Sequence, residues 1–347
     1  MLNHNNFTLE HIRKLQSETK RDPALLERVV YAFGLLEALS RVGLDFIFKG
    51  GTSLMLLLDK PMRLSTDIDI IVNPGTEVEQ YIKKAAEIFP FISYDEDIRR
   101  TSRDIEKRHF KFYYASHLTG RQFFILLDVV YQNDGYSHTA LSNITNIFLN
   151  CELPLVQVTT PTVNCILADK LTAFAPYTIG IPYGIDKELE IIKQHYDIAV
   201  LIDNMTDFSI VKNTYMSISE NEIKYRDLRD TNSFNTLQDS FKAAITIIGR
   251  GNLFTGDYKN LASGMSKIKG HILSNYSPQI AEQQSCRIAY LIANLLSEKN
   301  GYSLITDATF YEDKIISIPE YTKLNYMKRQ DILSFAYLYE AINLLTV

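Results

Sequence analysis

The chain has 347 residues, of which 46% are apolar, enough to build a large core in one domain or two. Its formal net charge of −5 excludes the global basic surface of a dedicated nucleic-acid coat protein, but it leaves room for local basic patches. The three cysteines lack metal-ligand spacing, and the sequence has neither a signal-peptide pattern nor an apolar run long enough to cross a bilayer. A cytoplasmic protein with no membrane segment is therefore expected.

Two helices and a short strand are expected at the start of the chain. Apolar residues recur at helical spacing over residues 9–18 and 23–41, which predicts an amphipathic helix in each segment. An aromatic and β-branched run at residues 46–48 then predicts a buried strand.

A glycine turn follows this strand. Gly50 and Gly51 can take backbone conformations that other residues avoid, and Thr52 is expected to cap a helix over residues 53–58. A helix that starts at such a turn aims its free N–H groups at one point, which suits a triphosphate. A simple β-turn is the alternative.

The next predicted strand, residues 67–72, carries two acidic residues on one face, because residues i and i+2 of a strand point the same way. Asp67 and Asp69 would repel each other unless a cation neutralised them, and magnesium can do so while it bridges substrate phosphates. Two such ions can clamp the attacking and leaving oxygens of an in-line displacement. A strand with a polar outer face is the alternative, but the glycine turn and the carboxylates in this order favour a metal-dependent nucleotidyltransferase site.

Helices and strands mix in the following segment. A helix is predicted over residues 77–89, and strands are predicted over 109–115 and 123–131. Asp128 is a lone acid inside the second of these apolar strands, where an unpaired charge would be costly. It could bind a metal ion, or it could make a local hydrogen bond at the end of the strand.

Helices dominate the rest of the chain. Asn164 opens a predicted helix that contains Lys170, and residues 188–203 form a second helix that contains Asp197. Beyond these the strand signals nearly vanish, so a C-terminal helical bundle is expected after a soft boundary near residue 210. Helical periodicity continues over residues 237–248, 258–274, 280–297 and 328–345.

Four motifs resemble the nucleotidyltransferase AbiEii toxin family, a branch of the DNA polymerase β-like nucleotidyltransferase superfamily. They are Lys49–Leu54 (KGGTSL), Arg63–Asp69 (RLSTDID), Asp169–Phe174 (DKLTAF) and Tyr196–Leu201 (YDIAVL). The resemblance covers roughly residues 20 to 210 and is most specific in its first half. It implies an α+β fold, with a polymerase β-like nucleotidyltransferase domain that has a mixed sheet and N-terminal helices over residues 1–210, and a helical domain over residues 211–347.

The resemblance also implies roles for single residues. Asp128 would complete the coordination of two magnesium ions with Asp67 and Asp69, and it would accept the proton of the attacking hydroxyl. Lys170 would contact the nucleotide phosphates, and Asp197 would orient Lys170 or activate the acceptor; ordinary surface roles are the alternatives. The predicted nucleotide-binding residues are Lys49, Gly50, Gly51, Thr52, Arg63, Ser65 and Lys170, and among the polar side chains around the turn, Arg63 and Ser65 fit the family pattern better than Lys49 and Thr66 do.

Other features are assigned blander roles. The basic run Arg99–Arg103, continued by Lys107–Lys111, could guide RNA to the site, but a solvated hairpin is favoured. The aromatic pairs Tyr113–Tyr114 and Phe123–Phe124 are expected in the core rather than as stacking platforms, and His195 has no metal-ligand spacing. The insert at residues 175–187, where many relatives have a shorter basic connection, leaves the acceptor contacts open.

The resemblance implies transfer of a nucleoside monophosphate from an NTP to an acceptor, with release of pyrophosphate. It further implies a toxin of a type IV toxin–antitoxin or abortive-infection pair, with a possible cognate antitoxin and the 3′ end of tRNA as the acceptor. A protein hydroxyl as the acceptor is one alternative. A catalytically silent nucleotide- or partner-binding module is another, and the complete set of three aspartates argues against it.

Overall fold

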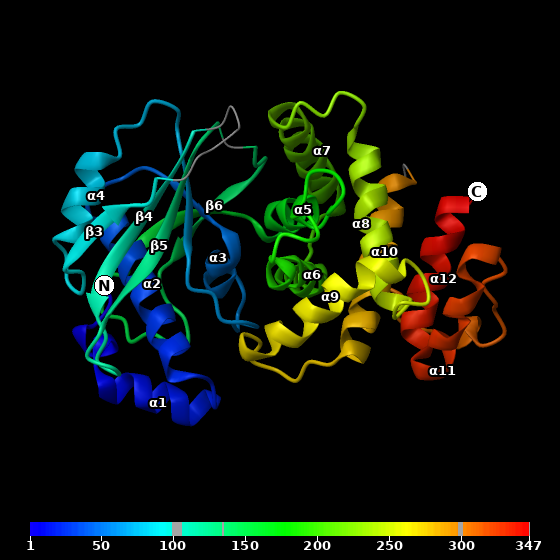
Figure 1. Ribbon diagram of the computed structural model, residues 1–347, viewed down its shortest axis with the longest axis horizontal. Coiled ribbons are helices and arrows are strands. Elements are labelled where there is room, and N and C mark those ends of the chain that lie inside the picture. Colours follow the sequence, from blue (N-terminus) through cyan, green and yellow to red (C-terminus); the bar gives the residue numbers. More distant parts are fainter. Residues whose placement is uncertain (99–105, 134, 298–300, 347) are drawn as a thin grey trace. The chain divides into compact units, whose positions relative to one another are not determined.

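The computed structural model of the chain describes residues 1–98, 106–133, 135–297 and 301–346 (Figure 1). Contacts divide it into two compact units. Unit 1 comprises Met1–Thr162 with Gly270–Ser274, and unit 2 comprises Val163–Lys269 with Asn275–Val347. By contacts, the break therefore comes after Thr162, whereas the division into domains at 1–210 and 211–347 stays a prediction.

Unit 1 is built on a mixed sheet. Its described residues form seven strands in the order β3-β4-β5-β2-β1-β7-β6, with the pairs β2–β5 and β1–β7 parallel and the other pairs antiparallel. The strands are β1 (Ile47–Lys49), β2 (Ile68–Val72), β3 (Ser93–Glu96), β4 (Lys107–Ala115), β5 (Gln122–Tyr131), β6 (Thr139–Asn143) and β7 (Gln157–Pro161). The helices are the 3-10 turn η1 (His4–Phe7), α1 (Leu9–Thr19), α2 (Pro23–Arg41), α3 (Gly50–Leu57) and α4 (Glu79–Ala86).

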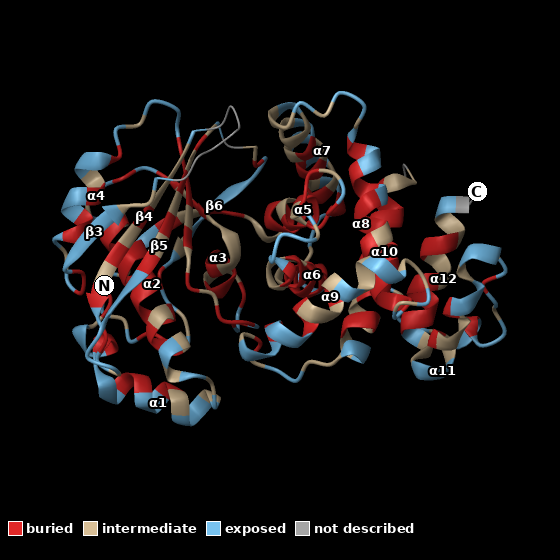
Figure 2. Cartoon of the chain, in the orientation of Figure 1, coloured by how far each residue is buried: buried red, intermediate tan, exposed pale blue. Residues whose placement is uncertain are grey.

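The core of unit 1 lies against one face of this sheet. Alternate residues of β4 and β5, such as Phe110, Phe112 and Leu127, are fully buried in one cluster with Val30 and Phe33 of α2 (Figure 2). Because side chains alternate across a strand, the residues between them point to the opposite face. The opposite face carries the candidate carboxylates.

All the regular elements among the described residues of unit 2 are helices, which confirms the expected C-terminal bundle (Figure 1). The long helix α10 (Pro278–Leu296) packs against α8 (Ser233–Ile248) and α12 (Ile332–Thr346). Helix α5 (Val163–Ala173) packs against α6 (Glu188–Asp203) and α7 (Phe208–Tyr225). The remaining elements are α9 (Thr255–Lys267), α11 (Met327–Gln330), and the 3-10 turns η2 (Ile268–Gly270), η3 (Thr309–Tyr311) and η4 (Pro319–Tyr326).

Three local predictions were wrong. The helix expected over residues 258–274 ends as α9 at Lys267 and is followed by a 3-10 turn that ends at Gly270. The helix expected over residues 328–345 breaks at Asp331, whose extended backbone (φ −159°, ψ 108°) separates α11 from α12. Thr52 does not cap a helix: α3 already begins at Gly50, and the Thr52 hydroxyl donates a hydrogen bond to the carbonyl of Asp67 at 2.6 Å. In the described part of the chain, no helix is both long and apolar enough to span a bilayer.

Candidate active site

The glycine turn joins β1 directly to α3, and glycine is required there for two reasons. Gly50 has a φ of +82°, a backbone conformation that side chains disfavour. A Cβ atom at Gly50 would also lie 2.1 Å from the Oδ2 atom of Asp69, so the backbone of the turn rests against this carboxylate. The N-cap residue Lys49 makes no side-chain cap bond to the first turn of α3, so binding of a phosphate by these N–H groups stays a prediction.

The second glycine of the turn lies against the two polar residues that fit the family pattern. A Cβ at Gly51 would come within 2.4 Å of Arg63 Nη2 and 2.9 Å of Ser65 Oγ. Arg63 is buried, its Nη1 donates to the carbonyl of Leu64 at 3.3 Å, and its backbone bridges to Ile272. The side chains of Arg63 and Ser65 therefore pack against Gly51, and their binding of phosphate stays a prediction.

Strand register brings two of the three predicted carboxylates together. Asp69 of β2 pairs with Asp128 of the parallel strand β5 on one side, and with Lys49 of β1 on the other. Residues paired in this way share a face and lie on strands about 5 Å apart. Asp67 immediately precedes β2, so the register of the strand does not fix the direction of its side chain, and its place beside the other two carboxylates stays a prediction.

Asp67 and Asp128, the two carboxylates that do not lie against Gly50, each have a basic neighbour that the sequence did not predict. His109 of β4 lies opposite Asp128, with its Nδ1 atom 2.6 Å from Asp128 Oδ1. Arg28 of α2 has its Nη2 atom 3.9 Å from Asp67 Oδ1. The spacing of residues in the sequence gives no sign of either pair, because both depend on the packing of distant segments.

The donor set can be tested against magnesium. Among the described residues, no three His, Cys, Asp or Glu side chains are grouped closely enough to hold a metal ion by themselves. Magnesium, however, usually takes one or two carboxylates and completes its shell with water and substrate phosphates. The oxygens of Asp69 and Asp128, on adjacent strands beside the start of α3, fit that requirement.

The two predicted residues of unit 2 also meet each other. Lys170 of α5 and Asp197 of α6 form an ion pair, with Nζ 3.1 Å from Oδ2 and side chains 7% and 2% exposed. Their roles toward phosphate and acceptor stay predictions. His195, two residues before Asp197, is fully buried with its Nε2 atom 2.7 Å from Ser285 Oγ. Burial lowers the pKa of its imidazole to about 3, so it is a neutral core residue.

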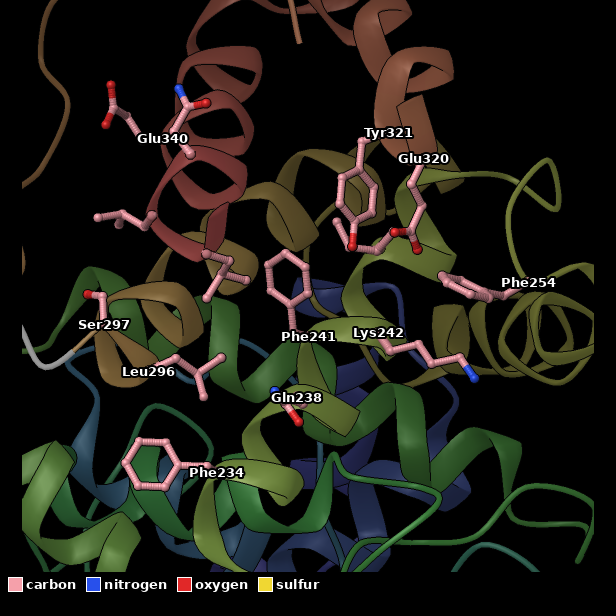
Figure 3. Close-up of a pocket in the computed structure, with 14 residues that line it drawn as sticks. Phe234, Gln238, Phe241, Lys242, Phe254, Leu296, Ser297, Glu320, Tyr321 and Glu340 are labelled. Atoms are coloured by element: carbon pink, nitrogen blue, oxygen red, sulfur yellow. The ribbon is translucent and has the colours of Figure 1, made fainter. Parts of the chain in front are cut away.

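Neither the basic run nor the cavity of unit 2 adds a residue to the candidate site. The basic run Arg99–Arg103 lies outside the described residues. Unit 2 has a cavity of about 1120 Å³ that contains none of the predicted site residues. Figure 3 shows the rings of Phe241 and Tyr321 extending into it, with Lys242 at one side. Nothing in its mixed lining points to phosphate chemistry.

We expect Gly50→Ala to lower the free energy of unfolding by about 1–3 kcal/mol more than Gly75→Ala does, because overpacking carries a cost of that size. Both glycines have a φ of +82°, so both variants meet the same backbone strain. A Cβ at Gly75 has nothing within 4 Å, whereas one at Gly50 meets Asp69. Urea unfolding of the two variants measures the difference, and equal losses would show that the close approach of the turn to Asp69 is unimportant.

Two solved structures are similar: "Crystal structure of JHP933 from Helicobacter pylori" (11% identity, TM-score 0.43) covers 78% of this chain and 93% of its own. "Crystal structure of putative nucleotidyltransferase from H. pylori" (12% identity, TM-score 0.42) covers 79% and 94%. No curated protein sequence matches. The sequence model of the family described as "Nucleotidyl transferase AbiEii toxin, Type IV TA system" matches residues 34–266, more than half of the chain. The chain therefore belongs to the AbiEii nucleotidyl transferase toxin family of type IV toxin–antitoxin systems.

Proposed function

We propose that this nucleotidyltransferase is magnesium-dependent and transfers a nucleoside monophosphate from an NTP to the 3′ end of tRNA in the cytoplasm, with release of pyrophosphate. The observation that carries the proposal is the register of Asp69 with Asp128 beside the glycine turn. This register sets two carboxylates next to the N-terminus of a helix. The carboxylates suit a metal ion, and the helix N-terminus suits an anion. Metal and triphosphate need these two features side by side.

We assign triphosphate binding, metal binding and proton transfer to different residues of the site. N–H groups at the start of α3 hold the triphosphate, and Asp69 and Asp128, with Asp67, would hold magnesium. Magnesium held there would supply positive charge that offsets the negative charge developing on the phosphates. We assign the role of accepting the proton of the attacking hydroxyl to Asp128, whose contact with His109 supports this role.

The reaction is a substitution at the α-phosphorus. The hydroxyl oxygen of the acceptor forms a bond to this atom, and the bond from the α-phosphorus to the bridging oxygen of the β-phosphate breaks. Pyrophosphate then leaves with the bonding electrons. Positioning and charge neutralisation supply most of the catalysis in such transfers. Lys170 remains the cation that the family motif assigns to the phosphates.

The test is a transfer assay with the purified full-length chain. Each NTP, labelled at its α-phosphate, is incubated with magnesium or with EDTA, and with either total tRNA or whole-cell protein. We expect label in tRNA, with magnesium, and none after periodate has destroyed the 3′-terminal diol. Label in protein would instead identify a protein hydroxyl as the acceptor. Label in neither pool would overturn the proposed transfer.

A further inference from the structure

The face of the sheet that carries Asp128 also carries a strip of aromatic and basic side chains, which we call the β4–β5 strip: Lys111, Tyr113 and Phe124. In the antiparallel pair of β4 with β5, His109 is opposite Asp128 and Tyr113 is opposite Phe124. These residues are an even number of positions apart on each strand, so they share one face. The strip is therefore continuous with the candidate active site.

The strip is exposed, contrary to the expectation that these aromatic residues belong to the core. Tyr114 is buried as expected, but the Phe124 side chain is 39% exposed and that of Phe123 is 38% exposed. Phe123 lies on the core face, where its ring is 6.5 Å from the ring of Tyr114 at the end of the strand. Phe124 lies on the opposite face, where no apolar cluster accounts for it within the described core.

The rings of the strip are held in place by their neighbours. Tyr113 meets Phe124 edge to face, with ring centroids 6.0 Å apart, and Lys111 Nζ lies 5.4 Å from the centroid of Phe124. An exposed aromatic ring beside a cation is a surface on which a nucleobase can stack. Lys111 also pairs with Asp97 at 3.3 Å, which offsets its charge, so stacking rather than charge would supply most of the affinity.

Distance decides which part of a nucleic acid the strip could reach. Phe124 is four residues before Asp128 on β5, which corresponds to about 13 Å along the strand. A stacked single strand rises about 3.4 Å per nucleotide, so about four nucleotides span this distance. A base near the 3′ end can stack on Phe124 while the terminal hydroxyl lies at the carboxylates.

We propose that the β4–β5 strip binds an unpaired base a few nucleotides before the 3′ hydroxyl of a single-stranded nucleic-acid acceptor. This inference rests on the proposed nucleotidyl transfer. It assigns Phe124 as the residue on which the base stacks and Tyr113 and Lys111 as the residues that hold the Phe124 ring.

The experiment compares two phenylalanines of equal exposure on opposite faces of one strand. The probe is a labelled single-stranded octaribonucleotide, and its affinity for the full chain is measured by fluorescence anisotropy. We expect Phe124→Ala to weaken binding about tenfold, the size of one base–aromatic stack. Phe123→Ala is expected to change it less than about twofold, and Phe124→Trp to retain it. Equal effects of Phe123→Ala and Phe124→Ala would overturn the assignment.

Further arms define the ligand. A dinucleotide is too short to reach from Phe124 to the carboxylates, so it should bind more weakly than the octamer, and equal affinity would contradict a site that spans this distance. A blunt RNA duplex should bind more weakly than the octamer, and binding equal to the octamer's would overturn a single-strand site. An octadeoxynucleotide tests whether the strip distinguishes DNA from RNA, since stacking alone accepts both.

Binding of NTP with magnesium, measured by calorimetry on the same variants, separates this inference from the proposed function. If the NTP binds but Phe124→Ala does not change the affinity for the octamer, the proposed role of the β4–β5 strip is overturned and the proposed nucleotidyl transfer is not. If neither ligand binds, both fail.

Discussion

Asp69→Asn is expected to lower kcat/KM for nucleotidyl transfer at least about 10³-fold, equivalent to about 4 kcal/mol of transition-state stabilisation. Asparagine keeps the shape of the side chain but removes the charge that would hold the metal. Asp69 is paired in register with both Asp128 and Lys49 and touches the glycine turn, so it is the centre of the site. The measurement is the rate of label transfer from an α-labelled NTP over a range of magnesium concentrations.

The matched control is Asp59→Asn, which removes the same charge from an exposed turn of the same unit. It should leave the rate within about twofold, since surface changes rarely matter. Urea unfolding of Asp69→Asn and of the parent checks that the variant is folded under the conditions of the assay. A variant that folds normally and keeps more than a tenth of the activity would contradict a metal role for Asp69.

The sequence was informative wherever local periodicity sets the structure. Helix α2 and helix α6 have the bounds that their apolar spacing predicted, 23–41 and 188–203. Helix α7 was missed because much of its sequence is polar and its start depends on a cap, with Asp207 accepting from the N–H groups of Ser209 and Ile210. Strand β7 was missed for another reason: it has only five residues, and the last is a proline, which is uncommon inside strands.

The candidate site was harder to predict because its geometry is not local. The order Gly50, Asp67, Asp69 can be read along the chain, but the pairing of Asp69 with Asp128 depends on β2 and β5 being neighbours. The approach of Arg63 to Gly51 likewise requires the tertiary fold. The exposure of Phe124 could not be predicted either, because the sequence of an apolar strand does not reveal which of its two faces is covered.

Breaking the buried ion pair between Lys170 and Asp197 should have the largest effect on stability. We expect Lys170→Met to lower the free energy of unfolding by about 3–5 kcal/mol, because it leaves the carboxylate of Asp197 buried without its cation. The double variant Lys170→Met, Asp197→Leu should recover most of this loss, since a buried pair replaced by apolar side chains is often near neutral. Urea unfolding at neutral pH of the parent, both single variants and the double variant gives the coupling between the two residues.

The control for this cycle is the exposed pair of Arg229 with Asp227, whose side chains are 82% and 76% exposed. Arg229→Met should change stability by less than about 1 kcal/mol, because water already screens the two charges. A Lys170→Met variant that is no less stable than Arg229→Met would mean that the Lys170 ammonium does not need Asp197 in the folded chain. The pair would then no longer explain why a lysine is tolerated in the interior of α5, and the role of Asp197 in orienting Lys170 would fall with it.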